Sequence, residues 1–165
     1  MKISNKPVVQ KIIQECINHG IKNVVFSPGS RNAPFALSFD AHPEIQTHVI
    51  HDERAAAFYA LGMSQTLEQT VALCCTSGSA VLNYYPAVSE AFYREQRLLI
   101  LSADRPKRLI NKGHGQTIMQ DQVFGKHVKS SLSVEDSNTN TNYESVTRFF
   151  GEMYMKPYRP MHQNI

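Results

Sequence analysis

An α/β fold with a doubly wound, mostly parallel sheet and helices on both faces is the architecture that this sequence predicts. Short apolar runs rich in β-branched residues alternate along the chain with stretches whose apolar residues recur at helical spacing. The run R-L-L-I-L-S-A at 97–103 is apolar almost throughout, which predicts a strand buried on both faces, as in parallel sheets. Alternating strands and helices of this kind form layered sheets with right-handed crossovers.

The individual elements are expected in a regular order. The first helix is predicted at 8–17, and Gly20 ends it. The alanine-rich stretch A-A-A-F-Y-A-L-G-M, which Glu53 opens, predicts a buried helix. The strands are predicted at 23–26, 46–50, 71–76 and 97–103, and the other crossover helices at 32–40 and 77–93.

The pattern changes after Ala103. Residues 104–122 are polar and interrupted by glycines, and a long segment of this kind is typical of a functional loop or of disorder. A polar surface loop at 137–142 and a last helix near 143–154 are expected to follow. Residues 157–165 resemble the start of another strand, so we expect a single domain at 1–165 that is part of a longer enzyme.

Composition excludes several classes of protein. The formal charge is only +3 and the basic residues are scattered, which argues against a nucleic-acid partner. No apolar run approaches the roughly 20 residues of a membrane span, and the first residues, M-K-I-S-N-K-P, lack the apolar core and cleavage site typical of a signal peptide. Three cysteines within apolar segments predict buried free thiols in a cytoplasmic protein; they are Cys16, Cys74 and Cys75.

Ligands of open parallel sheets bind beyond the carboxyl ends of the strands, so the residues that follow each strand form the candidate site. The segment S-P-G-S-R-N at 27–32 opens a helix, and its free N–H groups and Arg31 could cradle an anion. A plain Pro-Gly turn explains the same segment equally well. Arg105 directly follows a buried strand, where it could serve function, pair with Asp104 or cap a carbonyl.

Glu53 lies between a strand-like run and the alanine-rich helix, an unusual place for a carboxylate. Taken alone, it is best explained as a charge in the first helical turn, with Asp52 as the N-cap. No pair among His42, His48, His51 and His114 has convincing ligand spacing, so no metal site is predicted. Phosphate-loop, dinucleotide and nucleophile-elbow motifs are also absent.

Five motifs occur in an order that matches a known family. They are S-P-G-S-R-N-A-P, H-D-E-R-A-A-A-F-Y-A-L-G, T-S-G-S-A-V-L-N-Y-Y-P-A-V-x-E-A, S-A-D-R-P and G-Q-T-I-x-Q. Together they resemble the amino-terminal, pyrimidine-binding domain of the MenD family of thiamine-diphosphate enzymes, the SEPHCHC synthases of menaquinone biosynthesis. The resemblance covers roughly residues 6–131 well. The stretch K-R-L-I-N-K at 107–112 is more basic than the family pattern.

The resemblance gives Glu53 a catalytic role. A glutamate at this position hydrogen-bonds the aminopyrimidine ring of the cofactor and so promotes loss of the proton from its thiazolium carbon. In this family the enzyme decarboxylates 2-oxoglutarate and adds the succinyl carbanion to isochorismate. The resemblance further implies substrate-binding or active-site positions at Ser30, Arg31, Arg105 and Gln116, and cofactor-binding positions at Pro28, Ser77, Gly78 and Asn83.

The same resemblance implies that half of the site lies elsewhere. The diphosphate and its Mg²⁺ or Mn²⁺ ion are held in this family by a separate domain of a second subunit, whose G-D-G motif does not occur here. We therefore expect a homodimer or larger homo-oligomer, and no synthase activity from these 165 residues alone. Two alternatives remain: the same domain of another thiamine enzyme, such as an acetohydroxyacid-synthase-like protein, or a non-catalytic module that binds an anion or a partner.

Overall fold

The structure, a computed structural model, describes residues 4–110, 112–135 and 140–155. These residues contain a four-stranded sheet with the strand order β2-β1-β3-β4, in which all three pairings are parallel. The strands are β1 (Asn23–Phe26), β2 (Gln46–Val49), β3 (Val71–Cys75) and β4 (Leu98–Ser102). The predicted parallel α/β sheet is thus confirmed, and each strand lies where the sequence predicts it.

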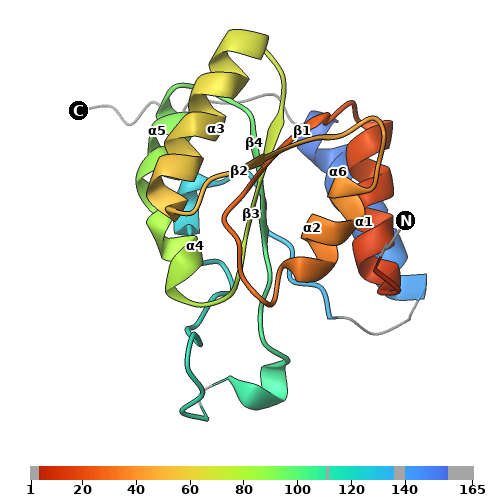
Figure 1. Ribbon diagram of the computed structural model, residues 1–165, viewed down its shortest axis with the longest axis vertical. Coiled ribbons are helices and arrows are strands. Elements are labelled where there is room, and N and C mark those ends of the chain that lie inside the picture. Colours follow the sequence, from red (N-terminus) through yellow and green to blue (C-terminus); the bar gives the residue numbers. More distant parts are fainter. Residues whose placement is uncertain (1–3, 111, 136–139, 156–165) are drawn as a thin grey trace.

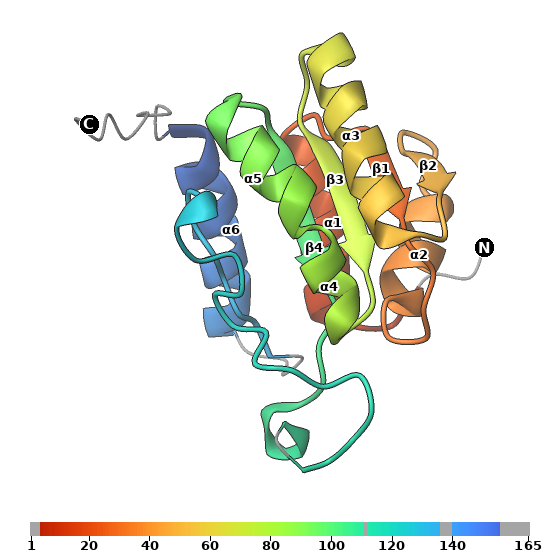
Figure 2. The same ribbon diagram turned by 90° about the vertical axis from the view of Figure 1, so that its left-hand side faces the viewer.

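Helices cover both faces of this sheet (Figures 1 and 2). One face carries α1 (Pro7–Asn18), α2 (Ala33–Asp40) and α6 (Asn140–Met155). The other carries α3 (Glu53–Leu67), α4 (Ser79–Asn83) and α5 (Tyr85–Tyr93). Short 3-10 turns follow β4 at η1 (Lys107–Leu109) and η2 (Gly125–His127). No helix in the described part of the chain has the length and apolar character that a bilayer-spanning segment requires.

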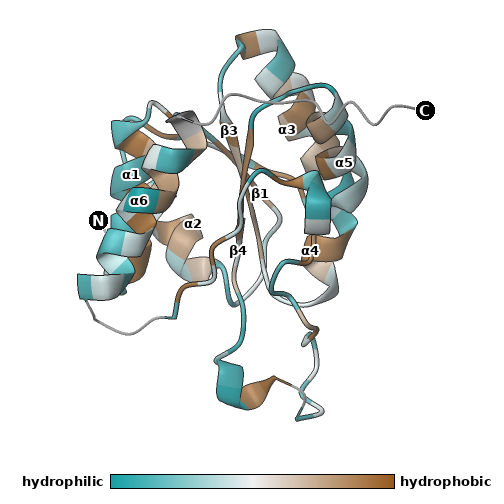
Figure 3. Ribbon diagram, turned by 180° about the vertical axis from the view of Figure 1, so that it is seen from behind, coloured by the Kyte–Doolittle hydropathy of each residue, from teal (hydrophilic) through white to brown (hydrophobic). Residues whose placement is uncertain are grey.

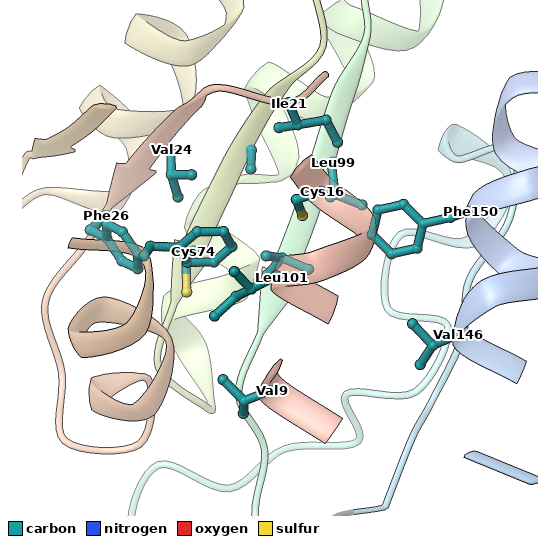
Figure 4. Packing of buried hydrophobic residues seen from close by; sticks show 13 residues of the cluster. Val9, Cys16, Ile21, Val24, Phe26, Cys74, Leu99, Leu101, Val146 and Phe150 are labelled. Carbon is teal, nitrogen blue, oxygen red and sulfur yellow. The ribbon is translucent and has the colours of Figure 1, made fainter. Parts of the chain in front are cut away.

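Two hydrophobic cores lie on either side of β3, whose five residues are all buried. Side chains alternate along a strand, so Cys74 enters the core beneath α1 and α6, whereas Cys75 enters the core beneath α3 and α5. Figure 4 shows the first of these cores, where Phe150 of α6 lies over Cys16 and Leu99. The two adjacent cysteines therefore point to opposite faces of the sheet.

The last helix is attached to the first by a buried carboxylate. Glu15 is only 4% exposed, and its Oε1 accepts a hydrogen bond from Thr147 Oγ1 at 2.9 Å and lies 2.7 Å from Lys11 Nζ. The outer sides of α1 and α6 are hydrophilic, as Figure 3 shows. This contact and the apolar side chains of α6 complete the cover on that face of the sheet.

Strand β4 differs from its prediction. Its continuous apolar sequence predicts burial on both faces, but only Leu99 and Leu101 are buried, while Leu98 and Ile100 are half-buried. The reason is the position of β4 at the edge of the described sheet, beside a cavity of about 530 Å³ lined by α5, α6 and residues 128–134. A local apolar pattern does not encode the strand order that decides this burial.

The third crossover also differs. One helix is predicted over 77–93, but the chain forms two, α4 and α5, which meet at Tyr84. Pro86 has no N–H, so the hydrogen bond that a continuous helix would make to the carbonyl of Leu82 cannot form. The chain instead closes a tighter turn in which Tyr84 N donates to Val81 O at 3.2 Å. Proline thus restarts the helix rather than sitting within it.

Helix α3 forms where the sequence predicts a buried helix, but it is buried on one side only. Ala56, Ala57 and Ala60 pack into the core, whereas Phe58 and Tyr59 are each 46% exposed. The predicted cap is confirmed, because the side chain of Asp52 accepts a hydrogen bond from Ala55 N at 2.7 Å. A cap and an apolar inner face are sufficient to fix this helix on the sheet.

The carboxyl-terminal helix is longer than predicted. It spans Asn140–Met155, so residues 140–142 belong to the helix and not to the expected surface loop. Asn142 Nδ2 donates to Glu135 O at 2.9 Å and links the start of the helix to the preceding segment. The strand expected at 157–165 lies outside the described residues.

The three buried thiols make stability fall at alkaline pH. Burial raises the pKa of Cys75 to about 12, and it also raises the pKa values of Cys16 and Cys74. Thiols of the unfolded chain ionise near pH 8.5. Stability is therefore complete below about that pH, and above it falls by roughly 1.4 kcal/mol per pH unit and thiol, until the folded-state pKa is reached.

Urea unfolding of the chain at pH 7.5 and pH 10 measures this loss, and Cys75→Ala provides the control. The variant is less stable at pH 7.5 because the substitution leaves a cavity. Its free energy of unfolding should fall less between pH 7.5 and pH 10, by the amount that one thiol contributes. Equal declines in the two proteins would show that Cys75 is not the titrating group.

Candidate functional site

The loops that follow β1 and β3 are in close contact at the carboxyl ends of the strands. A Cβ atom on Gly29 would lie 2.5 Å from Thr76 Cβ, so only glycine fits at that position. Asn32 Nδ2 donates to Ser27 O at 2.9 Å and to Cys74 O at 3.4 Å. Asn32 is the N-cap residue of α2 but makes no side-chain cap bond. Its buried amide instead fixes the S-P-G-S-R-N segment against the end of β3.

We expect Asn32→Asp to destabilise the chain by roughly 1–3 kcal/mol, because a buried carboxylate would face the carbonyl oxygens of Ser27 and Cys74 that now accept from the amide. The two side chains have nearly the same shape, so packing is unchanged. Thermal unfolding at pH 7.5 measures the effect, and Asn18→Asp, at an exposed position of α1, is the matched control. Equal melting temperatures for the two variants would contradict the bridging role of Asn32.

The segment after β4 extends beyond the carboxyl ends of the strands and returns to them (Figure 1). Ser77 Oγ donates to Gln116 O at 2.8 Å. Gly78 has φ 82° and ψ −143°, and a Cβ there would lie 2.7 Å from the carbonyl carbon of Gln116. Gly78 thus lets the backbone of the returning segment lie directly on the turn that follows β3.

This contact brings predicted residues from three loops together. Arg31 Nη1 donates to Gln116 Oε1 at 2.9 Å, across 85 positions of the sequence. Arg105 Nη2 donates to Gly115 O at 2.9 Å, which is the carbonyl-capping alternative of the sequence analysis. Arg105 Nε is buried and has no hydrogen-bond partner among the described residues. Two guanidinium groups therefore bind adjacent residues, Arg105 through the carbonyl of Gly115 and Arg31 through the side chain of Gln116.

Glu53 lies near the same strand end. It is the first residue of α3 and is half-buried. Burial raises the pKa of Cys75 to about 12, a hydrogen bond to Tyr84 opposes this, and the negative charge of Glu53 adds to it. Glu53 is thus within electrostatic range of Cys75, the last residue of β3, which Thr76, Ser77 and Gly78 directly follow. The half-burial agrees with a helix-start charge as well as with a functional carboxylate.

The other predicted residues are placed less closely. Pro28 and Ser30 are exposed in the loop after β1. Asn83 is exposed on α4, and its amide donates to Ser79 O at 3.0 Å, a bond within its own helix. The structure thus joins Arg31, Gln116, Ser77 and Gly78 by contacts, but among the described contacts it does not connect Asn83 to them.

Gln120 is a residue of this region that the sequence analysis did not single out. It is only 8% exposed, and its Oε1 accepts from Gly78 N at 3.0 Å. Its Nε2 donates to Ser102 Oγ at 3.0 Å and to Ala103 O at 2.9 Å. The sequence carried a signal, because Gln120 is the last residue of the G-Q-T-I-x-Q motif. Glutamine in a polar segment does not by itself predict burial.

Comparison with protein families decides what this arrangement belongs to. The family described as thiamine pyrophosphate enzyme, N-terminal TPP binding domain, matches residues 7–124. The chain belongs to this thiamine pyrophosphate enzyme family. Thiamine pyrophosphate, also called thiamine diphosphate, is accordingly its cofactor, and the resemblance found in the sequence is confirmed at the level of the family.

Two curated relatives of this thiamine pyrophosphate enzyme domain carry the same name. This chain is 52% identical over 134 residues to the 2-succinyl-5-enolpyruvyl-6-hydroxy-3-cyclohexene-1-carboxylate synthase of Christiangramia forsetii. The match covers 81% of this chain and 23% of the relative. It is 42% identical over 165 residues to the synthase of that name from Desulfotalea psychrophila, covering 97% and 31%. The chain thus spans about a quarter to a third of these relatives.

A solved structure supports the fold. The benzoylformate decarboxylase of Polynucleobacter necessarius superimposes with a TM-score of 0.66 at 20% identity, covering 76% of this chain and 23% of that one. Within the described residues of the thiamine pyrophosphate enzyme domain, no three His, Cys, Asp or Glu side chains are grouped as a metal site requires.

Proposed function

We propose that this chain is the pyrimidine-binding part of a synthase that decarboxylates 2-oxoglutarate and adds the succinyl carbanion to isochorismate. The product is 2-succinyl-5-enolpyruvyl-6-hydroxy-3-cyclohexene-1-carboxylate, the compound in the name of the curated relatives. The observation that carries the proposal is the Arg31–Gln116 contact, which gathers two arginines beside the strand end that Glu53 approaches. Both proposed substrates carry two carboxylates, and guanidinium groups bind carboxylates well.

Glu53 would hold the cofactor's pyrimidine ring. Its carboxylate makes no ion pair within the described part of the chain, so it is available to share a proton with a ring nitrogen. Thr76 Oγ1 is buried nearby without a hydrogen-bond partner among the described residues. Together with Pro28, Ser77 and Gly78, these groups fit one end of the cofactor. When bound, the cofactor supplies the electron sink for decarboxylation.

Arg31, Arg105 and Gln116 would bind and orient substrate carboxylates, with Ser30 as a hydroxyl donor from the same loop as Arg31. Arg31 uses only one of its donors on Gln116, and Arg105 Nε has no partner among the described residues, so both guanidinium groups retain hydrogen-bonding capacity. Asn83 stays a proposed cofactor contact, which would require its amide to leave the carbonyl of Ser79.

A second subunit would complete the site. Large apolar residues are exposed on α3, on α4 and at the start of α5: Phe58, Tyr59, Leu82 and Tyr85, 36–46% exposed. We propose that the diphosphate-binding domain of a partner subunit covers this face in a homodimer, and that the partner domain holds Mg²⁺ or Mn²⁺. The free cysteines support a cytoplasmic location.

Turnover by the full-length protein tests the proposal. With thiamine diphosphate and Mg²⁺, we expect 2-oxoglutarate to be consumed only when isochorismate is present. Absorbance measures this consumption, and mass spectrometry identifies the product. The 165 residues alone are expected to be inactive. Consumption of pyruvate in place of 2-oxoglutarate would favour the acetohydroxyacid-synthase-like alternative. A full-length protein that binds no thiamine diphosphate would favour the non-catalytic module.

A further inference from the structure

We infer that Gln120 is a positioning residue of the candidate site. It holds the backbone of Gln116 in place, and Gln116 is the hydrogen-bond partner of Arg31. This inference rests on the proposed function only because the activity assays below use the substrates proposed there. The geometry behind it is independent, since it consists of hydrogen bonds and close contacts within the chain.

Gln120 joins three segments that meet at the carboxyl ends of the strands. Its carbonyl oxygen accepts from Gly78 N after β3, and its amide nitrogen donates to Ser102 Oγ and Ala103 O at the end of β4. All three distances lie between 2.9 and 3.0 Å. Because one group must accept and the other must donate twice, a side chain that carries both functions at this length is required.

The link from Gln120 to Gln116 passes through Gly78. Gly78 lies between the Gln120 amide, bound to its N–H, and the backbone of Gln116, which occupies the space where a Cβ would be. Gln116 has φ 55°, a left-handed conformation that non-glycine residues seldom adopt. Ser77 Oγ secures the carbonyl of Gln116 from the other side. The side chain of Gln116 is therefore aimed at Arg31 by a backbone that Gln120 holds.

The alternative is that Gln120 only stabilises the fold. In that case its replacement would change the melting temperature, and any loss of activity would simply add to the loss caused by changing Gln116. A positioning role predicts a different result. Once the Gln116 side chain is absent, replacing Gln120 should cause little further loss of activity, because Gln120 acts through that side chain.

A double-mutant cycle in the full-length enzyme separates the two cases. The variants are Gln120→Met, Gln116→Ala and their combination, and Gln122→Met is the matched control because Gln122 is exposed two positions away. We expect each single site variant to lower kcat/KM for 2-oxoglutarate or isochorismate about tenfold or more, and the double variant to lose little beyond Gln116→Ala alone. Gln122→Met should match the unchanged enzyme. Additive losses, or no loss with Gln116→Ala, would overturn the inference.

Limited trypsin digestion provides a readout that does not depend on catalysis. The returning segment carries exposed cleavage sites at Lys107, Arg108 and Lys112. Releasing it from Gly78 and β4 should raise the cleavage rate there about tenfold in Gln120→Met and leave it unchanged in Gln122→Met. Equal rates in both would overturn the inference even if the full-length protein had another activity.

Should Gln120→Met fail to fold, Ser102→Ala removes one acceptor of the same amide while sparing the bond to Gly78 N. It is expected to raise cleavage less, by about threefold, and to show the same non-additivity with Gln116→Ala. Unchanged cleavage in Ser102→Ala together with additive activity losses would again reject the positioning role. An inactive unmodified enzyme, by contrast, would count against the proposed function alone.

Discussion

Glu53→Gln in the full-length protein is expected to lower kcat by about a hundredfold or more while leaving the fold intact. Glutamine has the shape of glutamate but cannot share the carboxylic proton, and general acid–base groups typically contribute about 10²- to 10⁴-fold. The position tolerates the change structurally, because Glu53 is half-buried at the start of α3 and Asp52 supplies the cap. Steady-state kinetics with circular dichroism on the same samples measures both halves of the expectation.

Asp52→Asn is the matched control for this experiment. Asparagine caps helices about as well as aspartate, so the bond to Ala55 N is kept while one neighbouring charge is removed. We expect its kcat to stay within about threefold of the unchanged enzyme, since surface charges are screened. If Glu53→Gln were as active as Asp52→Asn, Glu53 would be only a helix-start charge, the interpretation that the sequence alone favoured.

The two readings of Glu53 are not exclusive in physical terms. A carboxylate in the first turn of α3 is favoured by the helix dipole, and this stabilisation does not depend on the cofactor. Its proximity to Cys75 is a property of the packed structure, because α3 lies over β3 through alanines that allow close approach. The sequence predicted that Glu53 starts a helix. That this helix start lies near Cys75 could not be predicted without knowing the order of the strands in the sheet.

Local patterns predicted the strands well for a simple reason. β1 and β3 are short apolar runs bounded by polar residues, and both lie inside the sheet, where the pattern and the environment agree. β4 has the same pattern, yet it lies at the edge, because strand order is determined by packing between distant segments. Pro86 could have indicated the break between α4 and α5, because proline has no N–H, but the helical spacing of the apolar residues on both sides of it predicts a single helix.

The sequence predicted which residues belong to the candidate site, but it did not predict which of them contact one another. The residues after each strand could be named, because parallel strands end at one edge. The bond between Arg31 and Gln116 joins positions 85 residues apart, through a polar segment without periodicity. Only the left-handed backbone of Gln116 and the absent side chain of Gly78 make that approach possible.

Gly78→Ala is therefore expected to be the most destabilising single-methyl change in the described part of the chain, and to displace the segment that carries Gln116. Two costs combine at this position. The backbone at φ 82° and ψ −143° is nearly exclusive to glycine, at about 1–3 kcal/mol for other residues. The new methyl would lie 2.7 Å from backbone atoms of Gln116, and overpacking adds about 1–3 kcal/mol.

Three other glycines separate these costs. Gly20→Ala has the positive φ without a contact, and should cost about 1 kcal/mol. Gly29→Ala has the contact, at 2.5 Å from Thr76, without a positive φ, and should cost about 1–3 kcal/mol. Gly62→Ala, exposed in α3 with nothing within 4 Å, should stabilise the chain by about 0.5–1 kcal/mol.

Urea unfolding of the four variants gives their order of stability. We expect Gly78→Ala to lower the free energy of unfolding by roughly 2–6 kcal/mol, at least as much as Gly20→Ala and Gly29→Ala together. A Gly78→Ala protein as stable as Gly20→Ala would mean that the Gln116 segment moves away without cost. In that case Arg31 and Gln116 would not be held together by the fold, and the substrate role proposed for this pair would have to depend on the cofactor and the partner subunit instead.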